Sequence, residues 1–383
     1  MSEPYIVTFS HLRWDFVYQR PQHLMSRLAR QHSVLFIEEP VQDPSWTGWE
    51  ISSPALNVLV HRPHTPYPAR GFTPDQYPLL QNLLDQMVSH LDEYIVWLYT
   101  PMALPMVEAL HPEAMIYDCM DELSLFFGAP TQLAELEAKL VKNADLIFTG
   151  GRSLFKAKQA LRSDVYCFPS SVDAEHFKRA LKSEIRAPIA EPADQVALPH
   201  PRLGFFGVID ERIDLGLLLN LADAHKEWQI ILVGPVVKID PSSLPQRPNL
   251  HYLGKRKYEE LPAYVSGWDI CLLPFALNDA TRFISPTKTL EYMAAERPIV
   301  STPISDVVAD YGGIVYVGEP SKQFCIACEE ALHATTAERT ERRERMRQVI
   351  ARTSWDRTAQ QMEQLILNML DTKMADNVRI RAS

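Results

Sequence analysis

Short apolar runs alternate with segments of helical periodicity along almost the whole chain, and this alternation limits the possible folds more than any other feature. Runs of this length with helices between them are typical of parallel strands that are buried on both faces. The first series has apolar runs at residues 5–9, 34–37, 94–99, 115–117, 145–148 and 165–168. Residues 40–72 are rich in Pro, Ser and Trp, and we expect them to be mostly loop around a possible strand at 58–60.

A proline-rich stretch interrupts the alternation, and a second series follows it. The stretch ends in APIAEPADQVALPHP and has no strong periodicity, which is typical of a linker. The second series has apolar runs at residues 203–206, 229–233, 251–253, 269–273, 299–300 and 314–317. The predicted organisation is an N-terminal Rossmann-like domain at 1–178, a linker at 179–201, a second Rossmann-like domain at 202–352, and a C-terminal helix and tail at 353–383. In such doubly wound α/β domains, ligands bind outside the carboxyl ends of the strands, here in the cleft between the domains.

Composition excludes several classes of protein. The 383 residues carry a net charge of −10, which argues against a general nucleic-acid binder, whose binding surface should be basic. No apolar run approaches the length of a membrane-spanning helix, and the first residues do not resemble a signal peptide. Five cysteines suit a reducing cytoplasm. Cys325 and Cys328 have C-x-x-C spacing without a supporting second pair, so we expect them to pack in a core rather than bind zinc.

The most informative segment is SPTKTLEYMAAERPIV, residues 285–300. Ser285 is a suitable N-cap and Pro286 fits the first helical position, with Thr287 next, for the helix expected at about 287–295. Lys288 adds a positive charge to the free N–H groups at that helix start, and Glu291 lies on the same face. A cation for a diphosphate and a carboxylate for ribose hydroxyls would suit a nucleotide. An ordinary capped helix with a solvated Lys–Glu pair remains the alternative.

The same segment resembles the donor-binding signature of GT-B fold glycosyltransferases, in particular the family 4 or glycosyl transferases group 1 superfamily. The counterpart of the family's E-A-M-A-x-G-x-P-V-V is EYMAAERPIV, residues 291–300. Other similarities are PSSVD at 169–173, LGFFG at 203–207 and SWD at 354–356. The resemblance spans most of the chain. It implies a last helix that crosses back to the N-terminal domain, and it makes Gly207 the glycine that follows the first strand of the donor domain.

The chain departs from this family pattern at three places, which indicates a divergent subgroup. The second glutamate of the signature is replaced by Phe283, so the retaining stereochemistry of the family does not carry over. The glycine-rich loop after the first strand is replaced by SHLRWD, residues 10–15. The Arg/Lys pair that usually follows the glycine at 207 is not intact, and Arg212 is its nearest candidate for a diphosphate contact.

The N-terminal domain should bind the acceptor, and Asp118 and Asp121 stand at the end of the apolar run 115–117. Transfer to a hydroxyl benefits from a carboxylate or imidazole that removes its proton. We expect Asp121 to be the base, with Asp118 as the second choice. Both could instead cap the following turn.

A second group of candidates lies around the first predicted helix. His23 is a further catalytic candidate, and His11, Arg13 and Arg20 are candidates for acceptor or phosphate contacts. Each could equally be structural.

Together these features predict a metal-independent glycosyltransferase that transfers a sugar from a UDP- or GDP-linked donor to a hydroxyl acceptor. The donor is a co-substrate, and no cofactor or metal is expected. The resemblance implies cell-surface polysaccharide or glycoconjugate synthesis in the cytoplasm, with a lipid-linked acceptor and peripheral membrane contact conceivable. The alternatives are a sugar-nucleotide epimerase or hydrolase of the same fold, and a non-catalytic GT-B-like binding protein.

Overall fold

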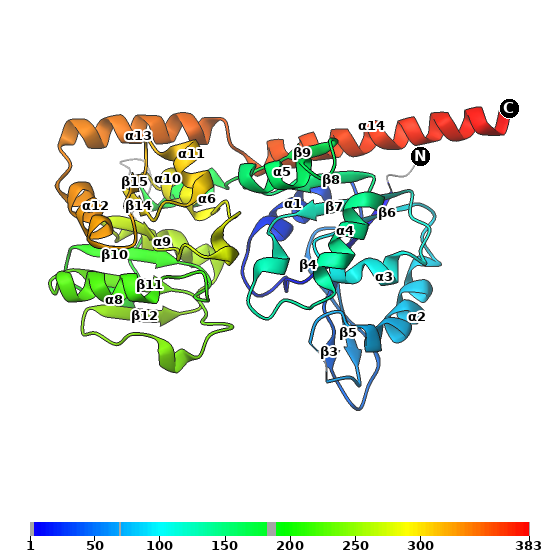
Figure 1. Cartoon of the computed structure of the whole chain (residues 1–383), viewed down its shortest axis with the longest axis horizontal. Coiled ribbons are helices and arrows are strands. Elements are labelled where there is room, and N and C mark those ends of the chain that lie inside the picture. The colour runs from blue at the N-terminus through cyan, green and yellow to red at the C-terminus, as the bar shows by residue number, and fades with distance from the viewer. Residues whose placement is uncertain (1–3, 69, 182–188, 383) are drawn as a thin grey trace. The chain divides into compact units, whose positions relative to one another are not determined.

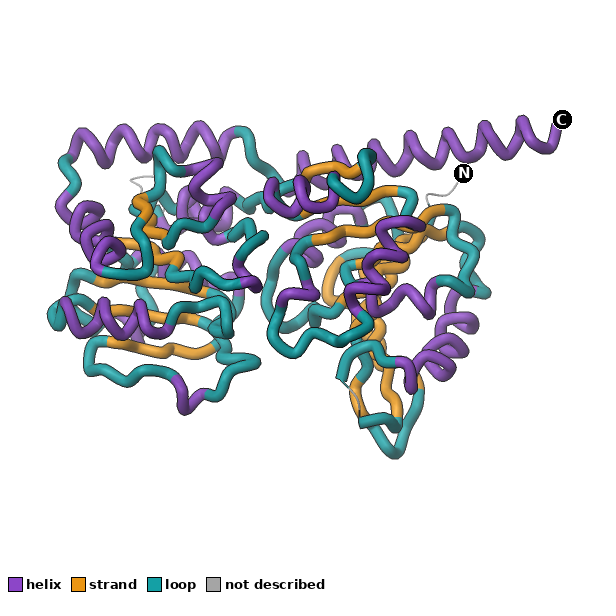
Figure 2. The backbone as a smooth tube through the Cα atoms, viewed as in Figure 1, coloured by secondary structure: helices purple, strands orange, loops and turns teal. Residues whose placement is uncertain are grey.

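The structure, a computed structural model, describes residues 4–68, 70–181 and 189–382. The chain divides into two compact units. Unit 1 comprises Met1–Ser124, Gly128–Pro169 and Trp355–Ser383, and unit 2 comprises Leu125–Phe127 and Ser170–Ser354. Part of the predicted linker, residues 182–188, lies outside the described residues. Figure 1 and Figure 2 show that each unit has its own sheet with helices around it.

Unit 1 is built on a nine-stranded sheet in the order β3-β5-β2-β1-β6-β7-β8-β9, with β4 paired to β5. All the pairings are parallel except β4 with β5, which is antiparallel. The central strands are almost wholly buried, as their apolar runs predict. The strands are β1 Tyr5–Ser10, β2 Val34–Glu38, β3 Val41–Gln42, β4 Gly48–Ala55, β5 Val58–Thr65, β6 Tyr94–Leu98, β7 Ala114–Cys119, β8 Leu146–Thr149 and β9 Val165–Cys167.

The prediction that residues 40–72 are mostly loop was wrong, because β3, β4 and the whole of β5 lie there, and only 58–60 had been expected as a strand. β5 joins the sheet through β2, with Val34 opposite Val58 and Ile37 opposite His61. β4 lies at the edge and is exposed along most of its length. An edge strand of this kind buries no apolar face, so it leaves no hydrophobic alternation in the sequence.

The helices of unit 1 connect and cover its strands. α14 packs against α1, and Trp355, Ala359, Met362 and Ile366 of α14 share a core with Leu24 and Leu28. Residues at this spacing lie on one face of a helix. The helices are α1 Arg20–Leu28, α2 Tyr77–Val88, α3 Leu104–Val107, α4 Leu133–Asn143, α5 Arg152–Gln159 and α14 Trp355–Ala382. The predicted return of the last helix to the N-terminal domain is therefore confirmed, and α14 runs further than the predicted 354–371.

Unit 2 has a six-stranded parallel sheet in the order β12-β11-β10-β13-β14-β15. The chain adds strands on one side of β10 and then moves to the other side with β13, so the switch of direction lies between β10 and β13. The strands are β10 Arg202–Phe206, β11 Gln229–Val233, β12 Leu250–Gly254, β13 Ile270–Leu273, β14 Ile299–Ser301 and β15 Tyr316–Val317.

Three of the helices of unit 2 were not predicted from the sequence: α6 follows β9, α7 lies in the predicted linker, and α11 follows β14. The helices are α6 Ala174–Phe177, α7 Ala193–Val196, α8 Leu215–Ala224, α9 Leu261–Ser266, α10 Lys288–Ala294, α11 Ser305–Tyr311, α12 Lys322–His333 and α13 Thr336–Ala351. Both units also contain short 3-10 helices. They lie at Pro74–Gln76, Pro101–Ala103, Leu123–Leu125, Lys178–Ala180, Pro241–Ser243, Tyr258–Glu260 and Asp279–Thr281.

The fold class predicted from the sequence, two parallel-sheet α/β domains, is confirmed. Cys328 is a core residue and Cys325 is partly buried against the same core. None of the helices in the described part of the chain is long and apolar enough to cross a membrane.

Candidate functional site

The strongest candidate site lies at the switch point of the sheet in unit 2. Gly207 directly follows β10, and α10 lies between β13 and β14 in the chain. In a doubly wound sheet, the crevice between the loops of the two strands at the switch point is the usual ligand site. The geometry brings together Gly207, Lys288 and Glu291, which the sequence had proposed for the donor.

Gly207 lies against the side chain of Lys288. A Cβ at position 207 would lie 2.2 Å from Cε and 2.7 Å from Nζ of Lys288, and the φ of Gly207 is +139°. A Cβ at the neighbouring Gly234 would lie 1.8 Å from the carbonyl oxygen of Gly207. At position 207 only glycine can adopt this backbone conformation and also leave room for the side chain of Lys288. The missing side chain at 207 lets the ammonium of Lys288 reach the end of β10.

Glu291 is buried on α10, within the field of Lys288. Burial raises the pKa of Glu291 to about 7, and the charge of Lys288 opposes this shift. A carboxyl with a pKa near neutrality, beside a cation in a ligand crevice, is a common property of functional sites. The alternative interpretation expected a solvated Lys–Glu pair, whereas the carboxyl of Glu291 is buried.

The predicted N-cap at Ser285 was wrong, because α10 begins at Lys288 and its N-cap residue is Thr287, without a side-chain cap bond. Ser285 and Thr287 are partly buried residues just before the helix. α10 has seven residues, so the short helix itself supplies only a small dipole.

Arg212 lies in the loop that begins at Gly207, and Asp210 holds its guanidinium. Nε and Nη2 of Arg212 donate to the Asp210 carboxylate, with Nη2 2.7 Å from Oδ2. The Arg212 side chain is 25% exposed. The pairing therefore fixes the guanidinium while leaving part of it accessible.

In unit 1, the candidates at the end of β7 separate into a buried residue and an accessible one. Asp118 is fully buried and accepts hydrogen bonds from Arg20, with Nη2 of Arg20 2.8 Å from Oδ1. Arg20 also donates to the carbonyl oxygen of Phe168 at 2.8 Å. Asp121 follows β7 and is partly exposed. The geometry favours a structural role for Asp118 and Arg20 and leaves Asp121 as the accessible carboxylate.

Glu122, next to Asp121, is tied to a buried lysine. Nζ of Lys158 lies 2.8 Å from Oε2 of Glu122 and 2.7 Å from Oε1 of Glu137. Burial and the charge of Glu137 raise the pKa of Glu122. This cluster anchors the segment that carries Asp121 to α4 and α5.

The histidine candidates differ in their surroundings. His23 is buried, and its ring stacks on Trp355 with centroids 4.9 Å apart, which favours a packing role between α1 and α14. His11 is partly buried in the loop after β1.

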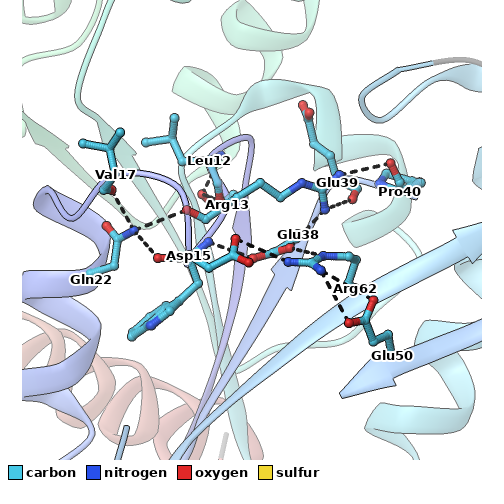
Figure 3. A network of polar contacts seen from close by, with 12 residues as sticks. Leu12, Arg13, Asp15, Val17, Gln22, Glu38, Glu39, Pro40, Glu50 and Arg62 are labelled. Atoms are coloured by element: carbon cyan, nitrogen blue, oxygen red, sulfur yellow. Dashed lines mark hydrogen bonds and ion pairs between the residues drawn. The ribbon is translucent and has the colours of Figure 1, made fainter. Parts of the chain in front are cut away.

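Arg13 joins the loop after β1 to the end of β2 (Figure 3). Its Nη1 donates to Oε2 of Glu38 at 3.0 Å, and its guanidinium also donates to the carbonyl oxygens of Glu39 and Pro40. Glu38 is fully buried. Arg13 lines an open cavity of about 400 Å³ that also includes Arg70. Arg70 could not be predicted from the sequence, because it lies in a segment without periodicity or motif.

Among residues 4–68, 70–181 and 189–382, no three His, Cys, Asp or Glu side chains are grouped in a way that could hold a metal ion.

Comparison with known proteins agrees with this arrangement. Residues 200–334 match the family model described as Glycosyl transferases group 1. The chain is 26% identical over 297 residues, 72% of each chain, to TuaH of Bacillus subtilis (strain 168), whose name assigns it to teichuronic acid biosynthesis as a glycosyltransferase.

Solved structures share the whole fold at low sequence identity. Sucrose-phosphate synthase from Thermosynechococcus elongatus is 14% identical with a TM-score of 0.73, covering 97% of this chain and 100% of that one. The α,α-trehalose 6-phosphate synthase from Burkholderia multivorans is 15% identical with a TM-score of 0.68, covering 100% and 99%. A trehalose-6-phosphate structure from E. coli, described as bound with UDP-2-fluoro glucose, is 14% identical with a TM-score of 0.68, covering 96% and 99%. The chain is thus a glycosyltransferase with the GT-B fold, and its residues 200–334 match the glycosyl transferases group 1 model.

Proposed function

We propose that this glycosyltransferase transfers a sugar from a UDP- or GDP-linked donor to a hydroxyl acceptor during cell-surface polysaccharide or glycoconjugate synthesis. The observation that carries the donor assignment is the contact of Lys288 with Gly207 at the switch point of unit 2. The name of the B. subtilis relative supports the polysaccharide setting. The UDP-2-fluoro glucose in the E. coli structure supports a nucleoside diphosphate sugar as donor.

The leaving group of such a reaction is a nucleoside diphosphate, whose negative charge grows as the glycosidic bond breaks. In our proposal, the ammonium of Lys288 neutralises this charge, a role that a metal ion fills in other enzymes. The accessible part of the Arg212 guanidinium adds a second cation, and the hydroxyls of Ser285 and Thr287 donate hydrogen bonds. The reaction would then need no metal and no other cofactor.

Glu291 is the proposed ribose contact. A carboxylate can accept hydrogen bonds from two neighbouring hydroxyls, and such charge-assisted bonds are stronger than neutral ones. Burial raises the pKa of Glu291 to about 7. Ribose binding would therefore favour the ionised form, and nucleotide binding should release a proton near neutral pH.

Asp121 is the proposed base that takes the proton of the acceptor hydroxyl. Asp118 is less suited to this role, because it is fully buried and paired with Arg20. The loop of Asp121 follows β7, at the carboxyl edge of the sheet where ligands bind. His23 and Arg20 have packing partners of their own, so we assign them no direct role.

For the acceptor, we propose a glycan of a cell-surface polymer, carried on a lipid. The enzyme would then work in the cytoplasm and reach the acceptor by peripheral contact with the membrane surface. The relative's assignment to teichuronic acid biosynthesis supports this setting.

The test measures nucleotide binding and transfer separately. Calorimetry with UDP and GDP should show binding to the full chain, and Lys288→Ala should weaken it. Asp121→Ala should leave binding unchanged and abolish transfer from the matching nucleotide sugar. Unchanged binding in Lys288→Ala would refute the donor site, and turnover of the donor without any acceptor would indicate a hydrolase or epimerase.

A further inference from the structure

Unit 1 contains a cavity that the proposed mechanism does not use. Its volume is about 400 Å³, and Arg13, Glu39, Gln42 and Arg70 are among the residues that line it. This volume lies within the range of small-molecule sites, about 300–1,000 Å³. The lining comes from the segments that follow β1, β2 and β5, and from β3. The cavity therefore lies at the carboxyl edge of a parallel sheet, where such folds bind their ligands.

One wall of the cavity is held rigidly by a buried carboxylate. Glu38 accepts from Nη1 of Arg13 at 3.0 Å, from Nε of Arg62 at 2.7 Å and from the backbone N–H of Trp14 at 2.7 Å. The side chain of Glu38 is 0% exposed. Figure 3 shows Arg13 and Arg62 converging on this carboxylate. The Arg13 guanidinium thus has a fixed position without depending on a ligand.

The charge of the cavity lining favours an anion. Arg13 and Arg70 contribute two positive charges, and Glu39 contributes one negative charge. Glu38 shares its own charge between Arg13 and Arg62. Arg70 is exposed and takes part in none of the ion pairs found within the described residues. A second cation therefore stands at the cavity with its charge still available to a ligand.

The kinds of side chain also suit a sugar. Guanidinium groups bind carboxylate or phosphate through paired hydrogen bonds. The carboxylate of Glu39 can accept hydrogen bonds from ring hydroxyls, and the amide of Gln42 can both donate to them and accept from them. A glycine at 71 allows this wall to form, because its φ is +79° and a Cβ there would lie 3.3 Å from Oε1 of Glu39.

We infer that this cavity binds the acceptor as a sugar that carries an anionic group, either a carboxylate or a phosphate. The inference rests on the proposed function, since it assigns the acceptor of that transfer. Arg70 holds the anionic group, Arg13 shapes the wall beside it, and Glu39 and Gln42 bind hydroxyls.

The experiment measures binding of three probes to the full chain by ligand-observed NMR: glucuronic acid, glucose 6-phosphate and glucose. At least one anionic sugar should bind ten times more tightly than glucose or better, and the tighter of the two identifies carboxylate or phosphate as the group. Equal binding of all three, or no binding of either anionic sugar, would overturn the inference.

Variants locate the binding in this cavity. Arg70→Ala should weaken binding of the anionic sugar about tenfold, and Gln42→Ala should weaken it about threefold. Both residues are exposed, so both variants should fold. The matched control is Arg30→Ala, which removes an exposed arginine outside the cavity lining and should leave probe binding unchanged. Unchanged binding in Arg70→Ala would show that the site lies elsewhere.

The same samples are titrated with UDP and GDP, which separates this inference from the proposed function. If Arg70→Ala still binds the nucleotide but no longer binds the anionic sugar, the result supports both the proposed function and the cavity assignment. If no nucleotide binds but the anionic sugar still depends on Arg70, the proposed function fails and the cavity assignment stands. Loss of nucleotide binding in Arg70→Ala would place the donor here and overturn the inference.

Discussion

The buried carboxylates of the two units differ in how they are compensated. In unit 1, Asp118 pairs with Arg20, Glu38 with Arg13 and Arg62, and Glu137 with Lys158. Burial raises the pKa of Asp118 as well, but Arg20 opposes this shift through both its charge and its hydrogen bonds. In unit 2, Glu291 is also buried, and only the charge of Lys288 opposes the rise of its pKa to about 7. A buried charge with a complete set of partners is structural, whereas an incompletely compensated one is suited to receive a ligand.

The largest effect is expected from breaking a complete pair in unit 1. Asp118→Ala leaves the guanidinium of Arg20 buried without its carboxylate, and such losses cost about 3–5 kcal/mol. Chemical denaturation followed by circular dichroism should show this loss in free energy of unfolding. The double variant Arg20→Met/Asp118→Leu should recover much of it. A double variant no more stable than the single one would mean that the pair is not the main contribution of these residues.

The next effect concerns Glu291 and depends on pH. Because its pKa is raised from 4.5 to about 7, the folded state keeps a proton that the unfolded state releases. The stability of the folded state should therefore fall by about 3 kcal/mol as the pH rises from about 4.5 to about 7. Glu291→Gln should lack this fall and be the more stable form at pH 8. Parallel pH profiles of the two proteins would contradict the burial of a titrating carboxyl.

A smaller effect is expected at Gly207, where a substitution can displace the ammonium of Lys288 from Glu291 without removing either charge. Gly207→Ala would place a Cβ 2.2 Å from Cε of Lys288 at a φ of +139°. The displaced ammonium should weaken UDP binding, and the strained backbone should cost about 1–3 kcal/mol of stability. Calorimetry and thermal unfolding measure the two effects. The matched control is Gly216→Ala in α8, where no atom lies closer than 3.4 Å to the added Cβ, and normal UDP binding there is the expected result.

The smallest effect should come from an exposed pair. Asp356 lies 2.6 Å from Nη1 of Arg30, with side-chain exposures of 52% and 64%, and it also lies 3.3 Å from Nε of the less exposed Arg27. Exposed pairs contribute about 0–1 kcal/mol, so Asp356→Asn should change the free energy of unfolding by less than 1 kcal/mol. A loss as large as that of Asp118→Ala would remove the distinction between buried and exposed pairs in unit 1.

The surroundings of the proposed donor residues could be predicted from the sequence better than those of the proposed acceptor residues, for a physical reason. Gly207, Lys288 and Glu291 each belong to a local pattern, either a strand followed by glycine or a helix start, and the order of strands then brings them together. The partners of Asp118 could not be predicted in this way, because Arg20 is 98 residues away. Pairing over such a distance depends on the order of strands in the sheet, which periodicity does not reveal.

The cavity of unit 1 shows the same limit. Arg13, Gln42 and Arg70 come from separate segments that lack a motif, and only the pairing of β5 with β2 and β3 gathers them. The fold class was predictable because buried parallel strands have a strong signal. The edge strand β4 and the start of α10 were mispredicted, because solvent-facing strands and short helices leave only a weak signal in the sequence.

The position of α14 has a practical consequence for work with this enzyme. The first and last segments of the chain both belong to unit 1, so unit 2 is an insertion between Pro169 and Trp355. Trp355 is fully buried and stacks on His23. A truncation before Trp355 would therefore look in sequence like trimming the end of unit 2, but it would remove part of the core of unit 1. A separately expressed unit 1 would need its two pieces joined by a short synthetic connection.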